Sequence, residues 1–262
     1  MSRDVLREQL AGHLERLQRD GVWGLSTRDV ARGAAAAGPS APGDLRPDPP
    51  ELPREPAGAG IPAAPPPAGS SEDGPDASLA VVEREALACV ACRLHEQRTK
   101  VVFGVGNPNA RLMFIGEGPG RDEDLQGEPF VGRAGQLLSR IIEAMGYRRE
   151  DVYIANAVKC RPPNNRDPQA DEIASCRHFL MRQVALIQPE IVVLLGRSAV
   201  SAVLDLQAPL SRLRGGFRDW NGVEVMCTYH PAYLLRNPAA KGMVWEDMKR
   251  VRDRLAATAG DS

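Results

Sequence analysis

The sequence predicts an α/β fold: a three-layer α/β/α sandwich built on a mostly parallel central sheet. Short apolar segments with strand composition alternate with segments that have helical spacing or capping signals. Three of the four apolar segments are nearly continuous runs, which is typical of strands buried on both faces. Alternating strands and helices favour parallel pairing with a helical layer on each face of the sheet. The predicted strands are 111–115, 152–155, 191–195 and 223–228, and the predicted helices are 134–145, 168–187, 197–204 and 243–257.

The first 78 residues are expected to lie outside the folded domain, which we predict over 79–262. Leu and Val residues near helical spacing predict a short amphipathic helix over 3–19, within an extension that covers 1–35. Twelve of the chain's 22 prolines follow that extension, in a stretch without aromatic residues. Such a composition cannot bury enough apolar surface to offset conformational entropy, so we predict a disordered linker over 36–78.

Composition excludes several classes of protein. Hydrophobic residues make up 43% of the chain, which is enough for a sizeable core without help from a metal. Five cysteines are too few for a disulfide-stapled scaffold, and the first residues lack the apolar core of a signal peptide. No run of 18 apolar residues exists, so no membrane span is expected. We therefore expect a cytoplasmic protein whose reduced thiols are free to bind a metal.

Each predicted element leads into a candidate functional segment. The first helix begins near residue 79 and ends close to Cys89 and Cys92. The helix over 168–187 has the clearest start signal, with Asp167 as N-cap and Pro168 in the first turn. Because parallel strands end at one edge of a sheet, the loops that follow them predict a single site there. These loops carry Gly116–Gly120, Asn156, Gly196–Ser198 and His230.

Four cysteines are spaced to hold one metal centre: Cys89-x₂-Cys92, Cys160 and Cys176. Four thiolates can bind zinc tetrahedrally or a [4Fe–4S] cluster with one thiolate per iron. Fifteen residues separate the last two cysteines, whereas structural zinc usually has two tight hooks, so the spacing favours a cluster without excluding zinc. The alternative is a set of unconnected buried thiols, which is also the reading we prefer for Cys227.

The loop residues offer a carboxylate and an aromatic ring to a ligand. Glu117 lies in a glycine-rich loop that lacks the Lys and Ser or Thr of a P-loop. It can activate water or face a developing cation, or it is a surface carboxylate in a tight turn. Phe130 stands in Glu-Pro-Phe-Val-Gly, where its ring can stack on a planar base. The structural alternative for Phe130 is a loop aromatic that packs into the core.

An amide, an imidazole and a basic loop complete the candidate set. Asn156 offers a donor and an acceptor together, which suits the edge of a pyrimidine, or it satisfies backbone groups at a strand end. His230 is either structural or catalytic, and its place beyond the last strand favours the second reading. The rigid loop 161–166 is basic and rich in amides, which suits phosphate contact. Leu235 and its neighbour Arg236 can present a wedge to a nucleic-acid stack.

Together these residues resemble the type-4, iron–sulfur branch of the uracil-DNA glycosylase superfamily. The resemblance covers roughly 79–258 and rests on five motifs in order: GEGPGRDED, EPFVGRAGQLL, NAVKCRPPNNRDP, LLGRSA and YHPAYLLRNP. It implies a three-layer α/β/α fold and hydrolysis of the N-glycosidic bond of uracil in DNA, which leaves an abasic site. Such enzymes extrude the target nucleotide from the stack. The resemblance also implies a [4Fe–4S] cluster on Cys89, Cys92, Cys160 and Cys176.

The resemblance implies roles for the pocket residues. Phe130 would stack on the extruded uracil, Asn156 would bind its edge, and His230 would stabilise negative charge on O2. Glu117 would polarise water or offset an oxocarbenium-like sugar, chemistry shared with glycoside hydrolysis. The other implied residues are Gly116 and Gly118 in the base pocket, Glu123 against the methyl group of thymine, Asn165 in support of catalysis, Arg161 and Arg166 on DNA, and Leu235 or Arg236 in the gap left by the base.

Covalent capture of DNA is not expected, and one departure from the family and two alternatives remain. One subgroup of the superfamily captures DNA covalently through a His on an added basic loop, and no such insertion separates NAVKC from RPPNNRDP here. The resemblance does not reach 1–78, where a repair or replication protein is an expected partner of residues 1–35. The expected substrate is single- or double-stranded uracil-containing DNA, bound by a monomer. The alternatives are a non-enzymatic iron–sulfur DNA-binding or redox module, and a scaffold that acts through residues 1–35.

Overall fold

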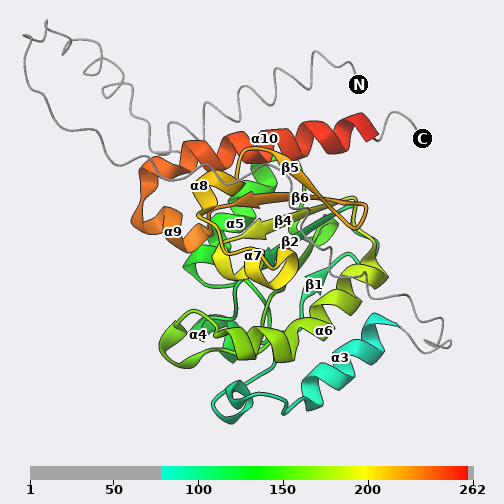
Figure 1. Cartoon of the computed structure of the whole chain (residues 1–262), viewed down its shortest axis with the longest axis vertical. Coiled ribbons are helices and arrows are strands. Elements are labelled where there is room, and N and C mark those ends of the chain that lie inside the picture. The colour runs from blue at the N-terminus through cyan, green and yellow to red at the C-terminus, as the bar shows by residue number, and fades with distance from the viewer. Residues whose placement is uncertain (1–77, 259–262) are drawn as a thin grey trace, which may run out of the picture. The chain divides into compact units, whose positions relative to one another are not determined.

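A computed structural model describes residues 78–258 of the chain (Figure 1). The predicted helix over 3–19, the extension and nearly all of the predicted linker lie outside these residues. The sheet has six strands in the order β1-β3-β2-β4-β6-β5. The strands are β1 (Val105–Gly106), β2 (Leu112–Gly116), β3 (Tyr153–Asn156), β4 (Ile191–Leu195), β5 (Phe217–Trp220) and β6 (Val223–Thr228).

The four predicted strands form the parallel centre of the sheet, and this confirms the predicted α/β class. β3, β2, β4 and β6 pair in parallel, whereas β1 and β5 pair antiparallel at the two edges. Every residue of β2, β3 and β4 is buried, as their continuous apolar runs predict. The sequence analysis did not predict the edge strands. β1 has only two residues, and β5 contains Arg218 and Asp219 on a half-exposed edge.

Helices cover both faces of the sheet. One face packs against buried residues of α3, α6, α7 and α8, and α3 lies along α6 (Figure 1). Leu112, Phe114 and Met226 face the other way and are also fully buried, where α5 and α10 contribute buried apolar faces. No helix of residues 78–258 is long and apolar enough to cross a membrane. The α-helices are α3 (Leu79–Ala88), α4 (Arg121–Gln126), α5 (Arg133–Ala144), α6 (Ala170–Ile187), α7 (Arg197–Leu204), α8 (Leu210–Leu213), α9 (Pro231–Arg236) and α10 (Lys241–Thr258).

The predicted start of α6 is wrong by two residues. Asp167 is not the N-cap and Pro168 does not lie in the first turn, because Gln169 is the N-cap residue. The carboxylate of Glu172 accepts the Gln169 backbone N–H at 2.8 Å, and this closes a capping box around the true start. The sequence signal Asp-Pro therefore marks the loop before α6, whereas a carboxylate three residues inside the helix decides where it begins.

Register brings the motif loops to one edge. Gly116 of β2 and Asn156 of β3 are direct partners, and Leu195 of β4 is paired with Thr228 of β6. The chain leaves all four parallel strands on this side, and the Gly196 N–H donates to the Thr228 carbonyl at 3.0 Å. The glycine-rich loop, Asn156, the start of α7 and the loop before α9 therefore begin at the carboxyl edge of the sheet, where α/β folds bind ligands.

Candidate active site

A cavity of about 1110 Å³ opens at this edge of the sheet. Its wall includes residues from each of the loops that follow the parallel strands, and it is larger than the pocket of a drug-sized ligand. The structure thus brings together nearly all of the pocket residues that the sequence analysis named. The cavity is lined by Glu117, Gly118, Glu123, Phe130, Asn156, Asn165, Arg166, His230 and Arg236 among others.

Asn156 lines this cavity and carries an unsatisfied acceptor. The residue is 1% exposed, and its side-chain Oδ1 is buried without a hydrogen-bond partner. Such an atom costs free energy unless something donates to it, so it marks a place where a ligand N–H belongs. Gly116 lies next to this amide. A Cβ at position 116 would lie 2.4 Å from Asn156 Oδ1 and 2.5 Å from the Phe130 ring, so only glycine fits. Gly116 therefore leaves the space in which the amide and the ring meet.

Phe130 is held over the cavity by a strained backbone. Its φ is 54°, in the left-handed region that residues other than Gly rarely adopt, and its side chain is 6% exposed. Arg149 donates to the carbonyl of Pro129, the residue before it. The carboxylate of Glu123 accepts the N–H groups of Val131 and Gly132 at 3.0 and 2.9 Å. These contacts on both sides of Phe130 fix the turn and direct its ring toward the cavity.

His230 is a neutral hydrogen-bond donor. Its Nδ1 accepts the N–H of Ala232 at 3.1 Å, so the proton of the neutral imidazole is on Nε2. Burial lowers the pKa of His230 to about 4, and the nearby positive charge of Arg236 acts in the same direction. The imidazole is therefore uncharged at neutral pH. Its ring centroid is 5.4 Å from that of Phe130, with 32° between the planes.

Glu117 accepts hydrogen bonds at the start of α7. The backbone N–H groups of Arg197 and Ser198 donate to its carboxylate. Burial and the negative charge of Asp167 raise the pKa of Glu117 above its usual value, although these two hydrogen bonds oppose the shift. Gly196 makes this approach possible: its φ is 93°, and a Cβ there would lie 2.3 Å from the carboxylate. Glu117 is thus a carboxylate fixed in position.

The remaining pocket and loop residues are placed as follows. The second carboxylate oxygen of Glu123 accepts the Gly120 N–H at 3.1 Å, so this side chain ties the glycine-rich loop to the Phe130 loop. On the exposed loop after β3, the side-chain Oδ1 of Asn165 accepts a hydrogen bond from the Nε–H of Arg161 at 2.7 Å. Leu235 and Arg236 both lie exposed on α9. The roles expected of these residues on thymine, catalysis and DNA stay predictions.

The four cysteines lie in segments that the fold brings together. Cys89 is the C-cap of α3, Cys92 precedes the 3₁₀ turn η1 (Arg93–Glu96), Cys160 follows β3, and Cys176 lies in α6. Cys160 and Cys176 each interact electrostatically with Cys92, and Cys176 also does so with Cys160. Cys160 also interacts with Cys89, so the fold brings these cysteines near one another, and their binding of one metal centre stays a prediction.

The surroundings of the sulfur atoms fit a bound metal centre. Sulfur atoms accept N–H donors from Ala91 at 3.5 Å, Lys159 at 3.3 Å and Arg98 at 3.2 Å, contacts that favour thiolates. Burial raises the pKa of Cys160, and it raises the pKa of Cys176 to about 11. A thiolate at either position therefore needs a neighbouring positive charge, such as that of a bound metal. Within residues 78–258, no three Cys, His, Asp or Glu side chains are arranged to hold a single ion.

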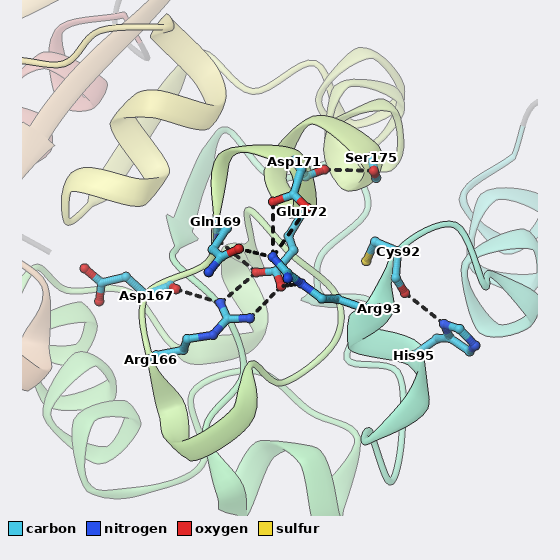
Figure 2. A network of polar contacts seen from close by, with 9 residues as sticks. All are labelled: Cys92, Arg93, His95, Arg166, Asp167, Gln169, Asp171, Glu172 and Ser175. Carbon is cyan, nitrogen blue, oxygen red and sulfur yellow. Dashed lines mark hydrogen bonds and ion pairs between the residues drawn. The ribbon is translucent and has the colours of Figure 1, made fainter.

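A buried carboxylate connects the cysteine segment to the loop after β3 (Figure 2). Glu172 is 0% exposed and is bound by Arg93 at 2.8 Å and by Arg166 at 2.6 Å. Figure 2 shows the two guanidinium groups reaching it from separate segments. The hydrogen bond from Arg166 is the largest of the effects that lower the pKa of Glu172 to about 2. Arg166 is thus paired with a buried carboxylate while its side chain stays 32% exposed, and its expected contact with DNA stays a prediction.

Replacing Glu172 with glutamine is expected to destabilise the fold by about 3 kcal/mol, because two arginines lose a buried anion. The folded-state pKa is lowered, so this contribution is present above about pH 4.5 and is lost as pH falls toward about 2. Urea unfolding at pH 7 measures the loss. Asp171→Asn, an exposed neighbour on the same helix, is the control. Equal unfolding midpoints for the Glu172 and Asp171 variants would contradict the prediction.

Two positioning residues were not found from the sequence. Arg149 has a buried Nη1 without a partner and holds the Phe130 turn through Pro129. Lys159 is 2% exposed, and its Nζ donates to the Asn156 carbonyl at 2.9 Å and to Gln183 at 2.5 Å. Lys159 carried one available signal, since it is a lysine between a buried strand and a cysteine ligand candidate. Arg149 carried none, because its partner depends on how a loop folds back.

Comparison with known proteins agrees with this geometry. Residues 103–249 match the family model described as the uracil DNA glycosylase superfamily. The type-4 uracil-DNA glycosylase of Thermotoga maritima is 47% identical over 178 residues, which cover 66% of this chain and 93% of the relative. The type-4 enzyme of Archaeoglobus fulgidus is 44% identical over 182 residues, 66% of this chain and 92% of the relative. The chain therefore belongs to the uracil DNA glycosylase superfamily and groups with its type-4 members.

Proposed function

We propose that this protein is a DNA repair glycosylase that hydrolyses the N-glycosidic bond of uracil in DNA. The observation that supports this most strongly is the buried, unsatisfied Asn156 Oδ1 beside the Phe130 ring in a cavity that also holds His230 and Glu117. The amide reads a pyrimidine edge, in which Oδ1 accepts the uracil N3–H. The ring stacks on the base after it leaves the duplex or single strand.

The chemistry follows from the two fixed polar groups. As the C1′–N1 bond breaks, its electron pair moves onto uracil, and negative charge develops on O2. The Nε2–H of His230 donates to that oxygen without giving up its proton, which is electrostatic stabilisation by a preorganised neutral donor. The Glu117 carboxylate stabilises the cationic sugar or polarises the water that adds to C1′. Water supplies the hydroxyl on C1′ and the proton that uracil finally takes up.

We propose that a [4Fe–4S] cluster on the four cysteines has a structural role. A cluster takes one thiolate per iron and therefore needs its sulfurs spread around a larger body than a single ion. The cluster would join α3, the loop after Asn156 and α6, and its chemistry is that of a cross-link between segments.

The function is tested with a fluorescent single-stranded oligonucleotide that contains one uracil, beside a matched thymine control. The full chain, purified without oxygen, is incubated with each oligonucleotide and then treated with hot alkali. Cleavage at uracil alone is expected, and the double variant Asn156→Ala with His230→Ala should not cleave. If iron-loaded protein binds DNA but leaves uracil intact in single- and double-stranded DNA, the protein is a binding module and the proposal fails.

The fall of kcat/KM at acid pH, the acid limb of the pH profile, is expected to follow the protonation of Glu117. Its pKa is raised above the usual 4.5, so the ionised form acts above that raised value and is lost as pH falls through it. We expect Glu117→Gln to lower kcat/KM about 10²-fold and to remove this limb. Glu143→Gln, an exposed change on α5, is the control and should keep it. An unchanged acid limb in the Glu117 variant would assign the titration to another group.

A further inference from the structure

The cavity extends beyond the part that holds Asn156 and Phe130. Tyr233 and Arg236, both on α9, border this outer region. A single pyrimidine needs only the inner part of a cavity larger than a typical drug-sized site. The outer region is therefore available for a neighbouring part of the same DNA strand.

Tyr233 presents an aromatic surface beside this outer region. Its side chain is 38% exposed, and among the Phe, Tyr and Trp residues of 78–258 it is the only exposed one. A tyrosine ring offers a large apolar face on which another planar group can stack. The backbone N–H of Tyr233 donates to the carbonyl of His230 at 2.9 Å, so the first turn of α9 fixes the main chain of Tyr233 next to the residue expected to contact uracil O2.

The hidden side of this ring is supported by a stack of fixed groups. The Tyr229 ring stacks on Tyr233 with centroids 5.0 Å apart and 28° between the planes. The guanidinium of Arg214 lies 5.7 Å from the centroid of the Tyr229 ring. Arg214 forms a 3.0 Å ion pair with Asp247, which is 0% exposed and accepts the Thr228 hydroxyl at 2.7 Å. The ring is thus preorganised, and a second planar group can stack on it with little loss of conformational entropy.

We propose that the exposed face of Tyr233 is a subsite for the nucleobase next to the extruded uracil on the same strand. This inference rests on the proposed function, because it takes the extruded base to be in the Asn156 pocket. Base stacking on an aromatic ring tolerates any sequence, and Arg236 on the same helix offers a cation to the phosphate that links the two nucleotides. The subsite holds the strand so that the scissile nucleotide stays in place.

The test uses single-stranded oligonucleotides in which an abasic spacer replaces the base on either side of uracil. With the full-length wild-type protein, one of the two spacers should raise KM about five- to 100-fold and leave kcat unchanged. Tyr233→Leu should raise KM by a similar factor on the oligonucleotide without a spacer. The abasic spacer should not raise the KM of this variant any further. Tyr233→Phe keeps the ring and should behave as the wild type.

Three outcomes would contradict the subsite. The first is a wild-type KM for Tyr233→Leu, and the second is a spacer that raises the KM of Tyr233→Leu as much as it raises that of the wild type. The third is a wild-type KM that neither spacer changes. Fluorescence anisotropy with the same oligonucleotides separates this proposal from the proposed function. If the wild type excises no uracil, the function fails, whereas the spacer effect on Kd still tests the Tyr233 subsite. If excision occurs and Tyr233→Leu matches the wild type in Kd and KM, only the subsite fails.

Discussion

Replacing His230 with alanine is expected to lower kcat for uracil excision about 10³-fold. The imidazole is neutral because burial lowers its pKa to about 4, and its proton is on Nε2 because Nδ1 accepts the Ala232 N–H. Removing one preorganised donor to a developing oxyanion costs factors of this size, since the alanine variant has only mobile water to offer. Steady-state excision of uracil from a single-stranded oligonucleotide at pH 7 measures the effect.

The same reasoning predicts which parameter changes and where the pH dependence lies. His230 donates to charge that develops in the transition state. Loss of such a donor lowers kcat more than it changes KM. Between about pH 5 and 8 His230 stays neutral, so its titration adds no limb to the wild-type profile in that range. His178→Ala, an exposed change on α6, is the matched control. A His230 variant within threefold of the His178 variant in kcat would remove the imidazole from the mechanism.

The sequence analysis predicted the centre of the fold well because that part has local signals. The strand 191–195 and the helix 197–204 are found as predicted, and the other strands and helices predicted within residues 78–258 begin within two residues of their predicted starts. Their apolar runs are buried on both faces, so local composition and tertiary environment agree. The loops at the strand ends share one edge for the same reason. Topology alone was enough to place Glu117, Asn156 and His230 near one cavity.

The contacts that orient the site had no comparable signal. Phe130 adopts a positive φ because Arg149 and Glu123 hold the residues on either side of it, and neither contact follows from spacing. Glu172 caps the start of α6 by accepting the Gln169 N–H, and it is also bound by Arg93, a partner 79 residues away in the chain. The contact with Arg93 depends on tertiary packing, which the local sequence does not reveal. Sequence patterns therefore pointed to the residues that share the cavity, whereas their orientation required the structure.

Replacing Cys160 with alanine is expected to have the second large effect, this time on folding. The proposed cluster would join three separate segments and so constrain the chain as a cross-link does, and loss of a native cross-link typically costs 2–5 kcal/mol. For a domain of this size that corresponds to a fall in Tm of roughly 5–15 °C, together with a lower soluble yield. Thermal unfolding of the full chain and its content of iron and acid-labile sulfide are the measurements.

The matched control is Cys227→Ala, which removes a buried thiol in β6 outside the group of four. It should keep the iron content and lose little stability, whereas Cys160→Ala should lose both iron and stability. Cys160 follows Asn156 by four residues, and Lys159 between them donates to the Asn156 carbonyl. Loss of the cross-link should therefore also disturb the amide that reads the base, and excision should fall as a consequence of the fold. A Cys160→Ala protein that is stable and fully active would show that the cluster does not shape the base pocket.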